Sequence, residues 1–177
     1  MKKIIKAAVP VIAVLALAAV ALIVRSVFFA APRAEEGEIK VQIRLGLEED
    51  IGLLLVEYEA DGAEGKGGFS NADRSMLAKD SDDLYWSLYA WQLDAPAEGT
   101  ELHLRLTAVT EYFEPNYEND YPEEYMVPMG EITFPAEFGA MYRLTVTGSA
   151  QGGYELSVER SPLKRAPLTR SPLKRLE

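Results

Sequence analysis

The stretch EIKVQIRL, residues 38 to 45, decides the fold class of this chain. Its apolar side chains stand at every second position, and polar side chains fill the positions between them. A period of two is typical of a β-strand with one face in a core and one face toward solvent. The pattern therefore predicts a half-buried strand that opens a folded domain spanning residues 38–159.

Similar patterns recur along the rest of this domain. Residues 101–112 alternate in the same way, and residues 140–148 and 153–159 flank the turn sequence SAQG as a predicted hairpin. The run LLLV in residues 53–59 is typical of a strand that is covered on both faces. Two more strands are predicted at residues 84–93 and around Ile132.

The connections between these strands are rich in glycine, proline or acidic residues. DGAEGKGG, residues 61–68, predicts a turn, and residues 69–83 predict a long loop with a short edge strand near Phe69. EPNYENDYPEEY, residues 114–125, predicts a long acidic loop. Seven or eight short strands separated in this way predict an all-β fold, an antiparallel β-sandwich.

One segment resembles a known family. PAEFGAMYRLTV, residues 135–146, resembles the region of immunoglobulin-like and fibronectin type III domains in which a tyrosine closes a corner of the sandwich. The resemblance implies that Tyr142 is that tyrosine and that Leu144 stands where an immunoglobulin domain has its second cysteine. Phe138 stands where these families usually have an acidic residue.

The N-terminal segment is strongly apolar. AAVPVIAVLALAAVALIV, residues 7–24, holds eighteen residues without a charge, and as a helix it would span roughly 27 Å. Three lysines precede it, which predicts a cytoplasmic N-terminus at residues 1–6, a single transmembrane signal-anchor helix at residues 7–29 and a linker at residues 30–37. The alternative is a cleaved signal peptide and a secreted domain. On either reading the C-terminal domain is extracytoplasmic.

Charge and composition exclude several classes of function. Residues 35–159 hold 27 acidic and seven basic residues, so the folded domain repels polyanions and we expect no nucleic-acid partner. The chain has no cysteine, which excludes a disulfide, a thiolate nucleophile and a zinc site built on sulfur. His103, the single histidine, lies on the polar side of its strand without a nucleophile motif, so we expect no catalytic residue and no enzyme.

Two groups of residues are candidates for binding. The acidic loop could converge on calcium through Glu118, Asp120, Glu123 and Glu124, although solvated acidic loops are commoner; no other cofactor is expected. In residues 84–93, Tyr85, Tyr89 and Trp91 share one face. If that face is open, they form a stacking platform for a sugar or a partner's apolar surface; if the strand is central, they are core.

The C-terminal residues 160–177 repeat the unit x-Pro-Leu-x-Arg three times and hold six basic residues. Prolines at this spacing predict a disordered, extended tail, which either has no role or contacts the domain, a protein partner or an anionic surface. The residues expected to contact an anionic surface are Lys164, Arg165, Arg170, Lys174 and Arg175.

These observations favour a non-enzymatic module of the cell envelope. It would be held in the membrane by residues 7–29 and would bind or scaffold an envelope protein or glycan partner outside. The alternative is a small carbohydrate- or calcium-dependent binding domain or hydrolase that uses residues 114–125. A third hypothesis is a subunit of a membrane complex.

Overall fold

The computed structural model describes residues 32–93, 99–116, 118 and 120–161. Within these ranges, no helix is both long and apolar enough to cross a membrane. The predicted transmembrane segment, residues 7–29, lies outside the described residues, as do the basic tail residues Lys164, Arg165, Arg170, Lys174 and Arg175.

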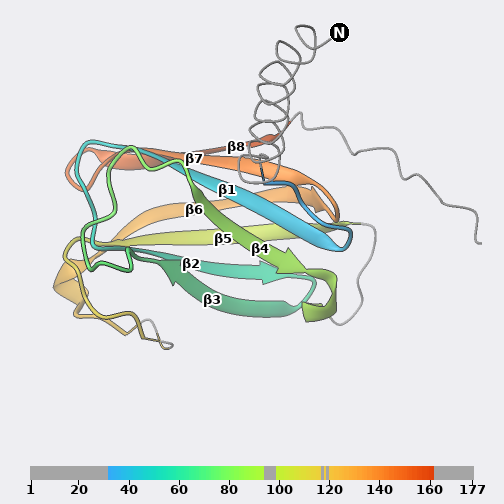
Figure 1. Cartoon of the computed structure of the whole chain (residues 1–177), viewed down its shortest axis with the longest axis horizontal. Coiled ribbons are helices and arrows are strands. Elements are labelled where there is room, and N and C mark those ends of the chain that lie inside the picture. The colour runs from blue at the N-terminus through green and yellow to red at the C-terminus, as the bar shows by residue number, and fades with distance from the viewer. Residues whose placement is uncertain (1–31, 94–98, 117, 119, 162–177) are drawn as a thin grey trace, which may run out of the picture. The chain divides into compact units, whose positions relative to one another are not determined.

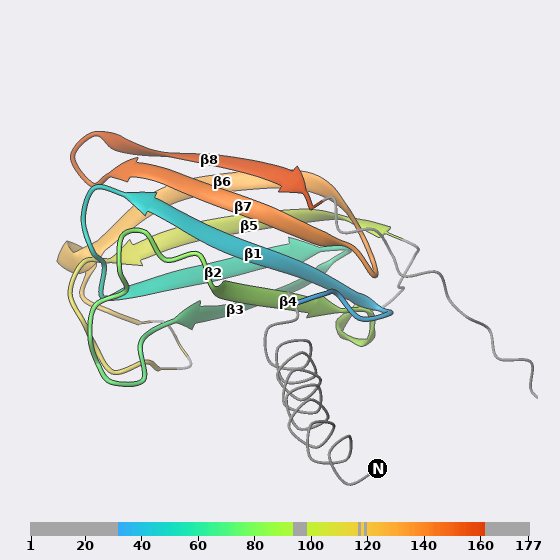
Figure 2. The same ribbon diagram turned by 45° about the horizontal axis from the view of Figure 1, so that its top comes forward.

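The described domain consists of β-strands and two single-turn 3-10 helices (Figure 1). The strands are β1 (Glu38–Leu47), β2 (Leu53–Ala60), β3 (Ala63–Phe69), β4 (Leu84–Tyr89), β5 (Gly99–Val109), β6 (Met126–Glu137), β7 (Met141–Ser149) and β8 (Gly153–Arg160). The 3-10 helices are η1 (Ala90–Gln92) and η2 (Glu123–Tyr125). The strands form two four-stranded sheets, sheet I in the order β4-β1-β7-β8 and sheet II in the order β3-β2-β5-β6 (Figure 2). The prediction of an all-β sandwich is confirmed.

The prediction of a wholly antiparallel arrangement is wrong at one pair. β1 and β7 run parallel, from Lys40 beside Met141 to Leu47 beside Gly148, whereas the other pairs are antiparallel. Five strands, β2 to β6, lie between β1 and β7 in the chain. No hairpin therefore joins β1 to β7, and none forces them to be antiparallel.

The core follows from the alternation seen in the sequence. Ile39, Val41 and Ile43 of β1 are fully buried, and they belong to the same apolar cluster as Leu104 and Leu106 of β5. Burying an aliphatic side chain of this size contributes about 1.5–3 kcal/mol, so these two strands alone supply much of the driving force for folding.

The LLLV run of β2 is covered on both faces, as predicted. Leu54 and Val56 belong to the main core, whereas Leu53 and Leu55 pack with Tyr121 in a second cluster. The acidic loop, residues 110–125, thus covers part of the outer face of sheet II.

The glycine-rich segment at residues 61–68 is not a turn, contrary to the prediction. Only Asp61 and Gly62 turn the chain, and β3 begins at Ala63 as an edge strand. One of its glycines serves packing: Gly65 lies opposite Tyr58, and a Cβ at Gly65 would lie 2.5 Å from the Tyr58 ring. The glycine at this position therefore reflects a close side-chain approach.

Strand β4 ends earlier than predicted. The side chain of Gln92 accepts a 2.8 Å hydrogen bond from the Tyr89 amide, and Leu93 N donates to Ala90 O at 3.2 Å. These local bonds close η1 and replace the predicted continuation of the strand to residue 93.

Tyr142 makes a contact of the kind implied by the resemblance. Its hydroxyl accepts a 2.9 Å hydrogen bond from Glu137 N, five residues upstream, and its ring packs against Phe134 with centroids 5.1 Å apart. The tyrosine therefore joins the end of β6 to β7.

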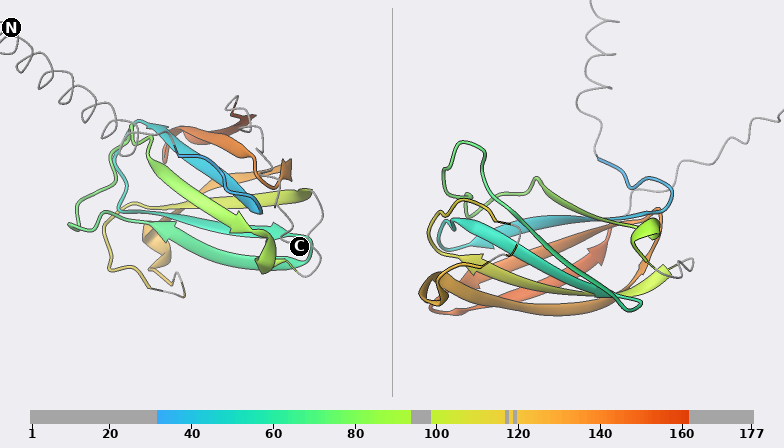
Figure 3. Two further views of the ribbon diagram at one scale, coloured as in Figure 1. Left: turned by 45° about the vertical axis from the view of Figure 1, so that its right-hand side comes forward. Right: turned by 90° about the horizontal axis from the view of Figure 1, so that it is seen from below.

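The strands run between two different ends of the sandwich (Figure 3, right). At the loop end meet residues 48–52, 70–83, 110–125 and 150–152. Hydrogen bonds connect these loops: Asp50 Oδ1 accepts from Lys79 N at 2.8 Å, and Glu49 Oε1 accepts from Ala150 N at 2.7 Å.

The opposite end, called the terminal end, carries both limits of the described chain. Residues 33–37 lead into β1 there, η1 follows β4, and residues 138–140 connect β6 to β7. Ser161 N donates to Met141 O at 2.8 Å, so the chain also leaves β8 at this end.

Candidate functional site

The outer face of sheet II carries two rows of polar side chains that cross its four strands. Strand register places residues of neighbouring strands opposite one another, and opposite residues point to the same face. The first row consists of Lys66, Glu57, Arg105 and Glu131. The second row consists of Glu64, Glu59, His103 and Thr133.

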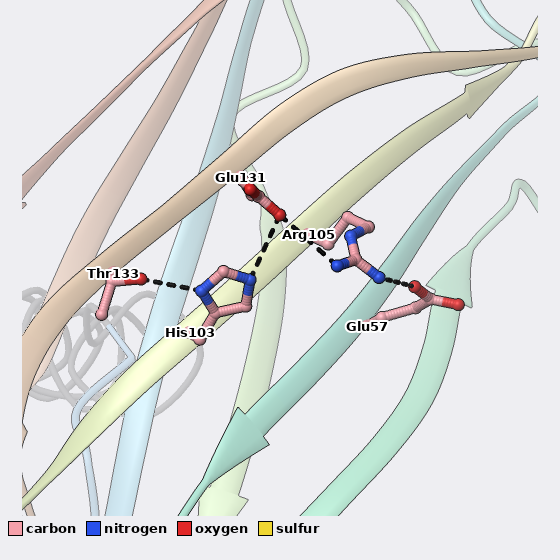
Figure 4. Close-up of polar contacts among 5 residues, drawn as sticks. All are labelled: Glu57, His103, Arg105, Glu131 and Thr133. Carbon is pink, nitrogen blue, oxygen red and sulfur yellow. Dashed lines mark hydrogen bonds and ion pairs between the residues drawn. The ribbon is translucent and has the colours of Figure 1, made fainter.

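The first row alternates in charge, and ion pairs join three of its members, Glu57, Arg105 and Glu131 (Figure 4). Arg105 lies between two carboxylates, with Nη1 3.3 Å from Glu57 Oε2 and Nη2 3.4 Å from Glu131 Oε2. These side chains are about half exposed, so each pair contributes at most about 1 kcal/mol to stability. Their main effect is to hold Arg105 in one orientation.

His103 connects the two rows (Figure 4). Its Nδ1 lies 2.7 Å from Thr133 Oγ1, and its Nε2 lies 3.4 Å from Glu131 Oε2. The order hydroxyl, imidazole, carboxylate resembles that of a nucleophilic triad. However, Glu131 is 58% exposed and shares its Oε2 with Arg105. Water screens such a carboxylate, which then stabilises an imidazolium only weakly.

A groove of about 470 Å³ lies over this face. Its lining consists of Glu57, Tyr58, Glu59, Glu64, Gly65, Lys66, His103 and Arg105. Among the described residues, Glu59 and Glu64 form no ion pair, although they lie directly opposite each other. Opposed like charges are unfavourable without a cation between them, so this end of the groove suits an ammonium or guanidinium group.

The predicted aromatic platform is only partly assembled. Tyr85 and Tyr89 are half-buried on the outer face of sheet I, where β4 is an edge strand. Trp91 is 80% exposed and stacks on Tyr89, with centroids 6.0 Å apart and planes at 18°. Tyr85 lies apart, and its pKa is raised by burial and further by the charges of Asp82 and Asp83.

The predicted calcium ligands lie exposed at the loop end. Among the described residues, no group of three or more His, Asp or Glu side chains is placed to hold a metal ion. The loop carrying Glu118 and Asp120 is held by other contacts: Asn116 Oδ1 accepts from Asp120 N at 3.1 Å, and the Lys66 ammonium donates to the Glu118 carbonyl. Glu123 and Glu124 lie in η2.

Glu38 is a buried acid that the alternation pattern missed. It is 1% exposed, and its Oε2 accepts a 2.7 Å hydrogen bond from Glu35 N. Burial raises the pKa of its carboxyl, but hydrogen bonds from Ser87 and Glu35, together with Lys40, outweigh burial, and the pKa falls below 4.5. The Lys40 ammonium also donates to Arg33 O at 2.9 Å, so residues 33–37 are tied to sheet I.

Acidic residues gather at the loop end. Its four loops contain Glu48, Glu49, Asp50, Asp73, Asp80, Asp82, Asp83, Glu111, Glu114, Glu118, Asp120, Glu123 and Glu124. The basic residues in the same loops are Arg74 and Lys79. The described part of the terminal end has Glu35, Glu36 and Asp61 in its loops, against Arg33. Among the described loop residues, the negative charge is therefore concentrated at the loop end.

No protein-family model matches the sequence, and no curated protein matches it. Among solved structures, a Gram-negative toxin is similar at 9% identity over 74% of this chain and 24% of the toxin, with a TM-score of 0.28. A non-hemolytic pneumolysin from Streptococcus pneumoniae is 12% identical over 72% of this chain and 24% of that protein, with a TM-score of 0.28. The membrane-binding domain of pneumolysin is 12% identical over 72% of this chain and 100% of that domain, with a TM-score of 0.25. The chain spans about a quarter of the length of the two whole toxins, and likeness at this level carries no conclusion about function.

Proposed function

We propose that this chain is a membrane-anchored, non-enzymatic module of the cell envelope that presents its acidic β-sandwich outside the membrane and binds a basic partner there. The main observation behind the proposal is that the acidic loops and the limits of the described chain lie at opposite ends of the domain. Both limits of the described chain lie at the terminal end, whereas thirteen carboxylates lie in the four loops of the opposite end.

This division fits a domain held close to an anionic leaflet. The apolar segment at residues 7–24 precedes the domain, and the linker joins β1 at the terminal end. Like charges repel, so an anionic membrane surface favours the orientation in which the acidic loop end points away from it. The most negative surface is then the one that a partner meets.

The groove on the outer face of sheet II, beside the turn at Asp61, is a second proposed contact for a basic partner. Three carboxylates line it. Glu59 lies between Glu64 and His103, and neither Glu59 nor Glu64 forms an ion pair among the described residues. A lysine or arginine of the partner would separate these two charges and pair with both.

The anchoring half of the proposal is tested by cysteine labelling, since the chain has no cysteine of its own. Gln151→Cys places a thiol at the loop end, and Lys3→Cys places one before the apolar segment. In intact cells, a membrane-impermeant maleimide should label the first variant and should label the second only after permeabilisation. Labelling of the second variant alone in intact cells would disprove the topology.

The binding half is tested with a fluorescent oligolysine peptide. Glu59→Gln combined with Glu64→Gln should weaken binding to the full-length chain, and the difference should shrink as salt rises. Glu48→Gln combined with Glu155→Gln removes the same number of charges from exposed positions outside the groove and is the matched control. Equal weakening by the control would show that binding depends on net charge rather than on the groove.

A further inference from the structure

We infer that Trp91, supported by Tyr89, inserts into the lipid interface next to the linker and orients the sandwich on the membrane. This inference rests on the proposed membrane anchoring and adds a specific contact to it. The partner surface is a phospholipid bilayer at the depth of its head groups.

The first observation is the exposure of Trp91. Among the described residues it is the one large hydrophobic side chain that is exposed, at 80%. Its position is not random, because the ring stacks on half-buried Tyr89 and therefore leaves the surface at a fixed place. An indole combines a large apolar body with an N–H donor, which is why tryptophan is enriched at membrane interfaces.

The second observation is the short tether. Residues 33–37 are fixed on sheet I, since Arg33 O accepts from the Lys40 ammonium and Glu35 N donates to Glu38. The chain between the end of the predicted membrane helix at residue 29 and residue 33 therefore spans at most about 14 Å. In the proposed anchoring, a tether of this length keeps the start of the domain close to the lipid.

The third observation is the contact between η1 and the end of the linker. Ala90 N donates to Gly37 O at 2.8 Å, so the residue before Trp91 is bonded to the last residue of the linker. The exposed indole and the point where the chain leaves toward the apolar segment thus share one end of the domain. At that end Glu38 is buried, so its carboxylate does not face the lipid.

The ring geometry favours lipid over a sugar. A sugar platform presents aromatic faces side by side, whereas Trp91 and Tyr89 are stacked on each other at 18°. With centroids 6.0 Å apart the two rings overlap only in part, and Trp91 stays 80% exposed as a single projecting indole. A single projecting indole can enter a lipid interface, whereas a sugar platform needs several ring faces side by side.

The test uses the full-length chain in phosphatidylcholine and phosphatidylglycerol nanodiscs, with and without brominated acyl chains. The protein contains two tryptophans, and Trp86 packs against Tyr58 at 5.3 Å. The fluorescence that is lost on Trp91→Phe substitution reports Trp91. We expect that component to be blue-shifted and quenched by brominated lipid, while the Trp86 signal left in the variant is not quenched.

Unquenched, water-like emission from Trp91 in a chain that coelutes with nanodiscs would overturn the inference, as would a Trp91 signal that responds to soluble glycans instead of brominated lipid. Failure of the chain to enter nanodiscs is a separate result and would contradict the proposed anchoring itself. Trp86→Phe, which leaves Trp91 as the sole tryptophan, gives an independent measurement of the same quantity.

Discussion

The hydroxyl of Ser87 donates a 2.6 Å hydrogen bond to Oε1 of Glu38, across the pair formed by β4 and β1. The same oxygen lies 3.0 Å from the Lys40 ammonium, and the other carboxylate oxygen accepts from Glu35 N. One buried side chain therefore joins the linker, β1 and β4. Its ionised form is favoured by three donors, which explains the lowered pKa.

Glu38→Gln should destabilise the domain at neutral pH by about 1–3 kcal/mol, because an amide nitrogen in place of either carboxylate oxygen cannot accept the hydrogen bonds made to that oxygen. A carboxyl whose folded pKa lies below its unfolded value stabilises the fold above the unfolded pKa and loses this effect as pH falls through the folded pKa. The unfolded value is near 4.5, so the difference between variant and wild type should shrink below that pH. Urea titrations at pH 7 and pH 3.5 measure it.

Ser87→Ala is the control for this prediction, because it removes one donor and keeps the charge. It should cost about 1 kcal/mol at pH 7. A free energy of unfolding that is the same for Glu38→Gln and wild type at both pH values would contradict the role of the buried carboxylate.

Gly52→Ala should destabilise the domain by more than about 3 kcal/mol. A Cβ at Gly52 would lie 1.8 Å from Glu111 O, and a backbone atom held by its own loop cannot move aside cheaply. Gly67→Ala in β3 is the matched control, since a Cβ there meets nothing within 4 Å. Thermal unfolding should separate the two variants clearly, and similar melting temperatures would show that the loops at Gly52 and Glu111 are looser than the contact implies.

Much of the fold could be predicted from the sequence, because apolar residues occupy every second position of a half-buried strand. β1, β5 and the β7–β8 hairpin are recognisable from alternation alone, and the LLLV run revealed that β2 has two covered faces. β3 was predicted only as a short edge strand near Phe69, because an edge strand that packs glycine against an aromatic ring has the composition of a turn.

The candidate groove could not be predicted, because it depends on register. His103 and Thr133 are opposite each other only because of the way β5 and β6 pair across a long acidic loop. Likewise Glu38 counts as a surface acid in the alternation of β1, but it is buried and bonded to Ser87 of the distant strand β4. The local pattern of apolar and polar residues does not reveal contacts between segments that are distant in the chain.

Calcium should leave the stability of the domain unchanged. The acidic side chains at the loop end are dispersed, and among the described residues none form a group that could hold an ion. A ligand that binds the native state raises the melting temperature, by the equivalent of about 2.7 kcal/mol at a hundred times its dissociation constant. Melting curves in millimolar calcium and in EDTA should coincide. A higher melting temperature in calcium, lost on Asp120→Asn, would support the predicted site at residues 118–124 instead.

The basic tail should strengthen contact with anionic lipid without contributing to the fold. The chain leaves β8 at Ser161, at the terminal end, which the proposal places next to the membrane. Five basic side chains follow within the next fourteen residues, and each contributes up to about 1 kcal/mol near an anionic surface. Residues 33–177 should therefore bind phosphatidylglycerol vesicles more tightly than residues 33–161, and rising salt should remove the difference.

Both fragments should melt at the same temperature, because the shorter one keeps the bond from Ser161 N to Met141 O. Neutral substitution of Lys164, Arg165, Arg170, Lys174 and Arg175 in the longer fragment should have the same effect as the truncation. Equal binding by all three fragments would show that the tail does not contribute to membrane binding.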